Sequence, residues 1–241
     1  MKYVFGPLQS RRLGKSLGIG LIPAKTCNMN CIYCEANATT DATNVRREFV
    51  PLDEVLKELD EVLAEKPALD SITFSGAGEP TLYSRLGEIV DFLKSRHPAY
   101  KTTLLTNGLL LGDKILQKEL AKIDLVMPSL DGSCQEEFDA ITRPSPRVDF
   151  DAVVAGLADF TKQASCPVYL ELFIVPGIND SDASIARFAG LLEKIRPARV
   201  QLNSLDRPGT ETSVRPAPPE TIRKFLASLG KIVPTETIRR T

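Results

Sequence analysis

The sequence predicts an α/β fold, a partial (β/α)6 TIM-like barrel whose parallel sheet is open on one side. Short apolar runs rich in β-branched and aromatic residues alternate with segments of helical period, a pattern typical of βα units around a parallel sheet. Polar, glycine-bearing motifs follow the carboxyl end of each predicted strand, and a barrel gathers such loops around one mouth. A doubly wound sheet would concentrate them at one switch point, so the barrel is favoured.

Six apolar runs predict the strands, in the order Ser16–Ile22, Ser71–Ser75, Thr102–Thr106, Asp124–Ser129, Val168–Val175 and Arg199–Ser204. Between them, apolar residues recur at the i, i+3, i+4, i+7 spacing of an amphipathic helix. The first such helix covers Leu52–Leu63 and follows Pro51, a residue favoured near a first helical turn. The spacing recurs in 185–195 and 222–229. A closed barrel has eight βα units, so the six predicted here leave one side open.

The composition is that of an ordinary folded protein, with 43% hydrophobic and 25% charged residues among 241. Thirty Lys and Arg against 31 Asp and Glu leave a net charge of −1, which gives no global field for nucleic acid or an anionic membrane. The absence of a long apolar run and of an apolar secretory leader predicts a cytoplasmic protein without a membrane partner. We expect a single domain over residues 1–241, with a core at about 16–206 and a C-terminal loop and helix at 207–241.

Three of the five cysteines, Cys27, Cys31 and Cys34, stand close together in CNMNCIYC, just after the first predicted strand. Disulfides are rare in the cytoplasm, so this spacing predicts a metal site. Zinc in a non-enzymatic α/β module is one alternative, but structural zinc takes four ligands and the only histidine, His97, is expected at the opposite face of the barrel. Three thiolates with an open position suit an iron–sulfur cluster that keeps one iron free.

The C-x3-C-x2-C motif in this position resembles the radical S-adenosylmethionine (radical SAM) superfamily, over residues 16–206. The opening FGPLQSRRLGKSLGIGLIPAKTCNMNCIYC, with the later SLD, RP and PGIND, is most similar to a branch of small proteins commonly labelled wyosine-synthetase-like. The resemblance implies that Cys27, Cys31 and Cys34 bind three irons of a [4Fe-4S] cluster and that SAM chelates the fourth. An electron donor such as flavodoxin or ferredoxin would then drive reductive cleavage of SAM to a 5′-deoxyadenosyl radical, which removes a substrate hydrogen.

The same resemblance implies contacts with SAM from the loops that follow the strands. The implied contacts are Tyr33, Gly76, Ala77, Gly78, Glu79, Thr106, Asn107, Ser129, Glu171 and Ile178. The AGE segment would hold the amino group, with Ala77 where the family usually has glycine. Tyr33 and Ile178 would lie beside the adenine. Glu171 would meet a ribose hydroxyl or a substrate cation, although strand alternation leaves an outward-facing position equally open.

Two substrate classes remain open for such an enzyme, a tRNA that is modified and a protein on which a radical is installed. The open side of the predicted sheet favours a macromolecule over a metabolite. The predicted lids are the loops 37–50 and 207–219. Cys134 and Cys166 are predicted to be free thiols, because an auxiliary cluster typically needs several further cysteines.

Overall fold

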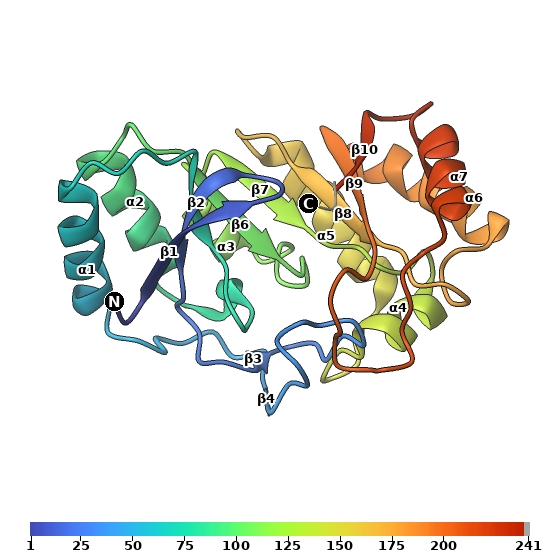
Figure 1. Cartoon of the computed structure of the whole chain (residues 1–241), viewed down its shortest axis with the longest axis horizontal. Coiled ribbons are helices and arrows are strands. Elements are labelled where there is room, and N and C mark those ends of the chain that lie inside the picture. Colours follow the sequence, from blue (N-terminus) through green and yellow to red (C-terminus); the bar gives the residue numbers. More distant parts are fainter. Residues whose placement is uncertain (239–241) are drawn as a thin grey trace.

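The computed structural model describes residues 1–238 and confirms an α/β fold with a mostly parallel sheet that does not close (Figure 1). Six parallel strands lie where apolar runs predict them: β2 (Gly14–Ile19), β5 (Ser71–Phe74), β6 (Thr102–Thr106), β7 (Leu125–Pro128), β8 (Tyr169–Phe173) and β9 (Arg199–Asn203). The last three residues of the predicted C-terminal segment, 239–241, lie outside the described residues.

The strands form one curved surface in the order β1-β2-β5-β6-β7, continued by β8-β9-β10. Two isolated parallel bridges, Val126 with Val168 and Ser129 with Glu171, join β7 to β8 across the curve. The antiparallel strand β1 (Val4–Ser10) forms one edge and β10 (Thr235–Thr237) the other. Within residues 1–238 these two edges do not pair with each other, so the partial barrel is open between them.

The apolar pattern predicts neither of the two edge strands. Most side chains of β1 are exposed or half-buried, and β10 consists of three polar residues in the segment expected to hold only a loop and a helix. Strand β10 exists through its pairing with β9, where Thr235 lies opposite Val200. Pairing with a neighbour in space creates no hydrophobic period, so sequence pattern alone does not reveal such strands.

The helices cover the convex face of the sheet (Figure 1). They are α1 (Leu52–Ala64), α2 (Leu86–Arg96), α3 (Lys114–Glu119), α4 (Gln135–Thr142), α5 (Phe150–Gln163), α6 (Asp182–Ile195) and α7 (Pro219–Leu229). The apolar stripe of each helix packs on alternate residues of the strands. Val55 and Leu59 of α1, for example, lie in the same fully buried core as Ile72 and Phe74 of β5. No helix among residues 1–238 is both long and apolar enough to cross a membrane.

The concave face of the sheet carries small hydroxyl side chains where closed barrels have bulky branched ones. Ser16 lies 2.5 Å from Thr73, and Ser71 lies 2.8 Å from Thr103, oxygen to oxygen. All four residues are buried and lie on neighbouring strands. Small side chains leave space inside the half-barrel, and their mutual hydrogen bonds satisfy their polar atoms.

Candidate metal and cofactor site

The three clustered cysteines lie in the loop that follows β2, at the carboxyl ends of the parallel strands. This loop is fixed to the end of α4 by two backbone hydrogen bonds. The amide of Asn30 donates to the carbonyl of Thr142, and the amide of Ile32 donates to the carbonyl of Ile141, both at 2.9 Å. The loop therefore has a defined conformation that depends on a helix more than a hundred residues further along the chain.

Cys27, Cys31 and Cys34 are free thiols in partly buried positions. Burial raises the pKa of Cys27 to about 12, that of Cys31 well above the ordinary value, and that of Cys34 in the same direction. A buried thiolate is unfavourable unless a cation compensates it, and metal binding displaces the thiol proton. The arrangement therefore fits a site that becomes charged only when it holds metal.

The two candidate metal centres need different spacings of the cysteine sulfurs. Within residues 1–238, no three His, Cys, Asp or Glu side chains are grouped closely enough to hold a metal ion. Tetrahedral zinc, with Zn–S bonds of about 2.3 Å, needs its sulfur ligands within about 4 Å of one another. A [4Fe-4S] cluster attaches its cysteines to separate irons and so takes them further apart. His97 lies after α2 at the opposite end of the sheet, hydrogen-bonded to Asp60 at 2.9 Å, so it supplies no fourth zinc ligand.

Asn28, the residue that follows Cys27, was not predicted as a site residue. It is fully buried, and its side-chain Nδ2 has no hydrogen-bond partner among the described residues. The Oδ1 of Asn28 accepts from Asn107 Nδ2 at 2.6 Å. This nitrogen of Asn107 also lies 3.6 Å from the sulfur of Cys27. An unpaired buried donor beside a thiol calls for an acceptor, which a cluster or its ligand would supply. The predicted residue Asn107 thus lies at the cysteines themselves.

Glu79, in the loop after β5, connects that loop to the end of β6 through hydrogen bonds. It is 3% exposed, and its Oε1 accepts from the hydroxyls of Thr106 and Thr81, both at 2.6 Å. Its Oε2 accepts from the backbone amide of Asn107 at 2.8 Å. Burial raises the pKa of this carboxyl despite these bonds. The structure therefore brings Glu79 and Thr106 together, and the Thr106 hydroxyl already has a partner within the chain.

The two glycines that precede Glu79 leave different amounts of space. Gly76 has φ +147°, and a Cβ there would meet only the Cα of Gly20, at 3.8 Å. At Gly78 a Cβ would lie 2.5 Å from the carbonyl oxygen of Thr26, so this position accepts no side chain. The carbonyl of Ala77 accepts a hydrogen bond from the backbone amide of Lys25 at 2.6 Å. Gly76 is thus the position of the three where a ligand could approach the backbone closely.

Tyr33 stacks on Phe173, with ring centroids 3.8 Å apart and an angle of 8° between the ring planes. Its hydroxyl donates to Asp131, which also accepts from the amide of Phe173 at 2.9 Å. Burial raises the pKa of Asp131 to about 7. Ile178 packs in the same apolar cluster. Tyr33 and Ile178 therefore pack against the same small apolar cluster, and one face of the tyrosine ring is covered by Phe173.

Glu171 faces the interior of the half-barrel, which decides between its two predicted orientations. Its carboxylate is paired with Arg12 from the β1–β2 turn, and Asn203 Nδ2 lies 3.5 Å from its Oε1. Ser129 lies beside Glu171 through a parallel bridge, and its amide donates to the carbonyl of Thr106. The cation that Glu171 meets here belongs to the protein itself.

Arg12, Asp131 and Phe173 are site residues that the sequence did not predict. Asp131 is the third residue of the SLD motif, a signal that could have identified it. Arg12 belongs to a pair of arginines of the kind that usually forms solvated surface. Only the fold shows that the β1–β2 turn reaches β8.

One of the two predicted lids covers the cysteine loop. The amide of Glu211 donates to the carbonyl of Ile32 at 2.8 Å, and Arg143 forms an ion pair with Glu211 at 2.6 Å. A Cβ on Gly209 would lie 2.4 Å from the carbonyl oxygen of Tyr33, so backbone packs directly on backbone. Figure 1 shows this loop, ahead of α7, running beside the segment that holds β3 (Thr26–Cys27).

The sequence profile of the Radical SAM superfamily matches residues 21–189, which include all three clustered cysteines. The chain belongs to the Radical SAM superfamily. A UPF0026 protein of Methanocaldococcus jannaschii is 31% identical over 99% of this chain and 74% of its own length. A Brachyspira hyodysenteriae protein named GTPase Obg is 39% identical over 86% of this chain, which spans only 30% of that protein.

Solved structures share the fold at lower identity. A radical SAM methyltransferase from Sphaerobacter thermophilus has a TM-score of 0.71 and 18% identity, covering 92% of this chain and 66% of its own. Streptococcus suis SuiB bound to S-adenosylmethionine has a TM-score of 0.66 and 16% identity, covering 89% and 48%. Members of the superfamily use a [4Fe-4S] cluster and SAM, which confirms the predicted cofactors. Membership also supports a SAM-cleaving radical enzyme. The roles of individual residues stay predictions.

We expect one cluster per chain, with about four irons. Cys134 precedes α4, after the carboxyl end of β7, whereas Cys166 lies before the amino end of β8. The two thiols are therefore at opposite ends of the sheet and cannot share a cluster. Iron analysis of protein reconstituted without oxygen checks this expectation. An iron content of about eight that falls when Cys134 and Cys166 are replaced with alanine would contradict it.

Proposed function

We propose that Cys27, Cys31 and Cys34 bind three irons of a [4Fe-4S] cluster in a radical SAM enzyme that takes hydrogen from a large substrate. The observation that carries the proposal is the set of three partly buried thiols at the mouth of a partial barrel. Beside them lies the side-chain nitrogen of Asn28, which has no hydrogen-bond partner among residues 1–238. When bound, the cluster and SAM supply a 5′-deoxyadenosyl radical. The reaction class of the enzyme, tRNA modification or protein activation, follows from the substrate.

The residues around the cysteines would position SAM and exclude water. Gly76, three residues before Glu79, offers open backbone that the amino group of SAM could approach. Tyr33, Phe173 and Ile178 form an apolar wall for the adenine. The loop that contains Glu211 covers the cysteine loop and shields it from solvent. Each role concerns binding and orientation, because the radical chemistry belongs to the cofactors.

Enzymes of this superfamily need a reductant, and we propose flavodoxin or ferredoxin as the electron donor. All five cysteines are free thiols in the structure. Free thiols and an oxygen-sensitive cluster are best maintained in a reducing compartment, so we propose the cytoplasm as the location.

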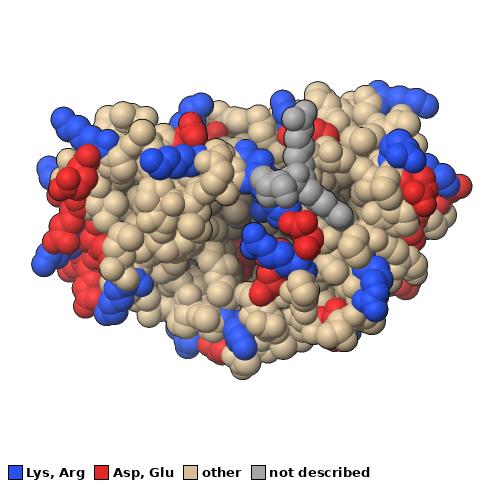
Figure 2. All heavy atoms as spheres, in the orientation of Figure 1, with Lys and Arg blue, Asp and Glu red and all other residues tan. Residues whose placement is uncertain are grey.

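The open side of the sheet supports a macromolecular substrate. Strands β1 and β10 do not pair with each other within residues 1–238, and Figure 2 shows the molecule hollowed near the centre of the face that it draws, where acidic and basic side chains gather. A large partner can reach into such an opening and cover it. A metabolite would need a lid, and the loop at 207–214 is already engaged with the cysteine loop.

Reconstituted enzyme, SAM and dithionite, incubated without oxygen, should produce 5′-deoxyadenosine that mass spectrometry detects. We expect protein or RNA fractions of a cell extract to increase this production by several-fold. Protease or ribonuclease treatment of the active fraction then distinguishes a protein from a tRNA substrate. Stimulation by the small-molecule filtrate alone would contradict the large-substrate proposal, and no 5′-deoxyadenosine under any condition would contradict the radical SAM activity.

A further inference from the structure

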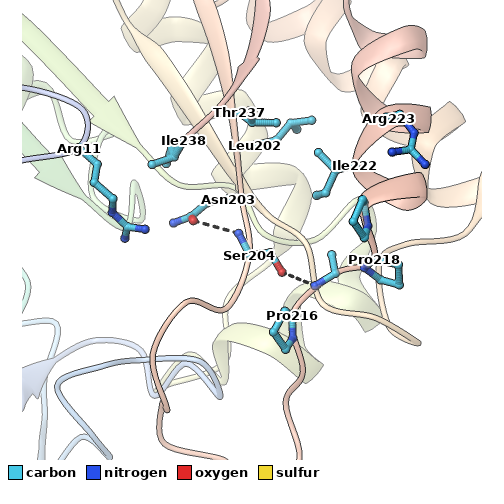
Figure 3. A pocket seen from close by; sticks show the side chains of 12 residues that line it. Arg11, Leu202, Asn203, Ser204, Pro216, Pro218, Ile222, Arg223, Thr237 and Ile238 are labelled. Atoms are coloured by element: carbon cyan, nitrogen blue, oxygen red, sulfur yellow. Dashed lines mark hydrogen bonds between the residues drawn. The ribbon is translucent and has the colours of Figure 1, made fainter. Parts of the chain in front are cut away.

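A cavity of about 620 Å³ lies at the open side of the half-barrel and has no role in the site described above. It lies between the β1–β2 turn, the carboxyl ends of β9 and β10, and the first turn of α7 (Figure 3). The residues that line it are Arg11, Leu202, Asn203, Ser204, Pro216, Ala217, Pro218, Pro219, Ile222, Arg223, Thr237 and Ile238. This volume is in the range of pockets that bind small molecules or single groups of larger ones.

Much of the lining is apolar, and two of its polar side chains already form hydrogen bonds with backbone groups of the protein. Ser204 donates to the carbonyl of Ile174 at 3.1 Å and accepts from the amide of Ala217 at 2.7 Å. Asn203 Oδ1 accepts from the amide of Ser204 at 2.9 Å (Figure 3). Ile222 projects into the space opposite them. The cavity therefore favours an apolar group in its middle.

The charges on the lining have one sign. Arg11 and Arg223 stand on opposite sides of the cavity, and none of the described residues that line it is acidic. Arg11 is held in place by Asp206 at 2.7 Å, a contact that occupies one terminal nitrogen of a guanidinium with five N–H donors. The remaining donors suit a carboxylate or a phosphate, which arginine binds in bidentate fashion.

The cavity adjoins the cofactor site. Arg11, Asn203 and Ser204 also line a smaller space of about 220 Å³ that Tyr33 and Glu171 border. A group bound in the larger cavity would therefore end beside the residues expected to hold SAM. This placement is the one that a substrate for hydrogen abstraction requires.

We propose that this cavity binds the reacting part of the substrate, an apolar group that carries a carboxylate or phosphate, with Arg11 as the residue that selects for the anion. The statement that the bound group belongs to the substrate rests on the proposed radical SAM function. The statement that the cavity binds such a group does not. A macromolecule would insert this group through the open side of the sheet, between the β1–β2 turn and α7.

The test measures binding to the reconstituted full chain by calorimetry without oxygen, using 4-phenylbutyrate, 4-phenylbutyl phosphate and 4-phenylbutylamine as probes. We expect one site per chain for an anionic probe and at least tenfold weaker binding of the amine. Arg11→Gln and Ile222→Asn should each weaken anion binding by about tenfold, a loss that corresponds to about 1.4 kcal/mol. Comparison of the two anions shows whether carboxylate or phosphate is the better ligand.

Arg196→Gln is the matched control, because it removes the same charge at the far end of α6, outside the cavity, and should leave binding unchanged. Arg223→Gln, on the exposed surface of α7, serves as a second variant should Arg11→Gln fail to fold. Equal affinity for amine and carboxylate, or binding that no cavity variant weakens, overturns the proposal. Arg11-dependent binding by a chain that makes no 5′-deoxyadenosine supports the cavity and contradicts the enzymatic function.

Discussion

Replacing any one of Cys27, Cys31 or Cys34 with alanine should reduce 5′-deoxyadenosine formation to background. Three protein ligands leave one iron free for SAM, so no thiolate is redundant. Removing a residue that only hydrogen-bonds to a metal ligand lowers metal affinity or activity by about 10- to 100-fold. Removing a ligand itself should therefore lower activity by more than about 100-fold. The measurement is 5′-deoxyadenosine by mass spectrometry after reconstitution, together with iron content per chain.

Cys134→Ala and Cys166→Ala provide matched controls, since both residues lie outside the cysteine loop. Each should retain the iron content and activity of the unchanged protein. A Cys31→Ala variant with full activity would refute the radical SAM mechanism. A variant that loses zinc rather than iron would support the alternative of a zinc module.

Glu79→Ala should destabilise the protein by about 3 kcal/mol, because removal of a buried acceptor leaves several donors unsatisfied. The carboxylate accepts from Thr81, Thr106 and the amide of Asn107, and nothing in this variant replaces it. The free energy of unfolding, from urea titration of the cluster-free chain, measures this effect. The change should also loosen the link between the β5 loop and β6, and so weaken SAM binding.

Glu79→Gln separates the structural role from the cofactor role. It keeps the size and one oxygen acceptor, so its loss of stability should be smaller than that of Glu79→Ala. Loss of the negative charge should weaken SAM binding by about 10- to 100-fold if the carboxylate meets the SAM amino group. Glu61→Ala, on the exposed face of α1, is the control and should change stability by no more than about 0.5 kcal/mol. SAM affinity unchanged in Glu79→Gln would show that Glu79 serves the fold alone.

Local sequence patterns predicted most of the structure because they report local physics. The six parallel strands are apolar runs buried on the convex side, and the helices between them carry apolar stripes at helical spacing. The cysteines were recognisable because their spacing lies within one short loop. The motif residues Glu79 and Thr106 come together in the structure because the carboxyl ends of neighbouring parallel strands meet at one edge.

The sequence by itself therefore determined the fold class, the cysteine motif and the end of the sheet that bears the site. Only the tertiary structure decided that Arg12 meets Glu171 and that β10 forms an edge of the sheet. It also decided that the side-chain nitrogen of Asn28 has no hydrogen-bond partner among residues 1–238. Arg12 and Glu171 are 159 positions apart in the chain. Their contact depends on the curvature of the sheet and on the twist accumulated over several strands, which no local period of hydrophobic residues records.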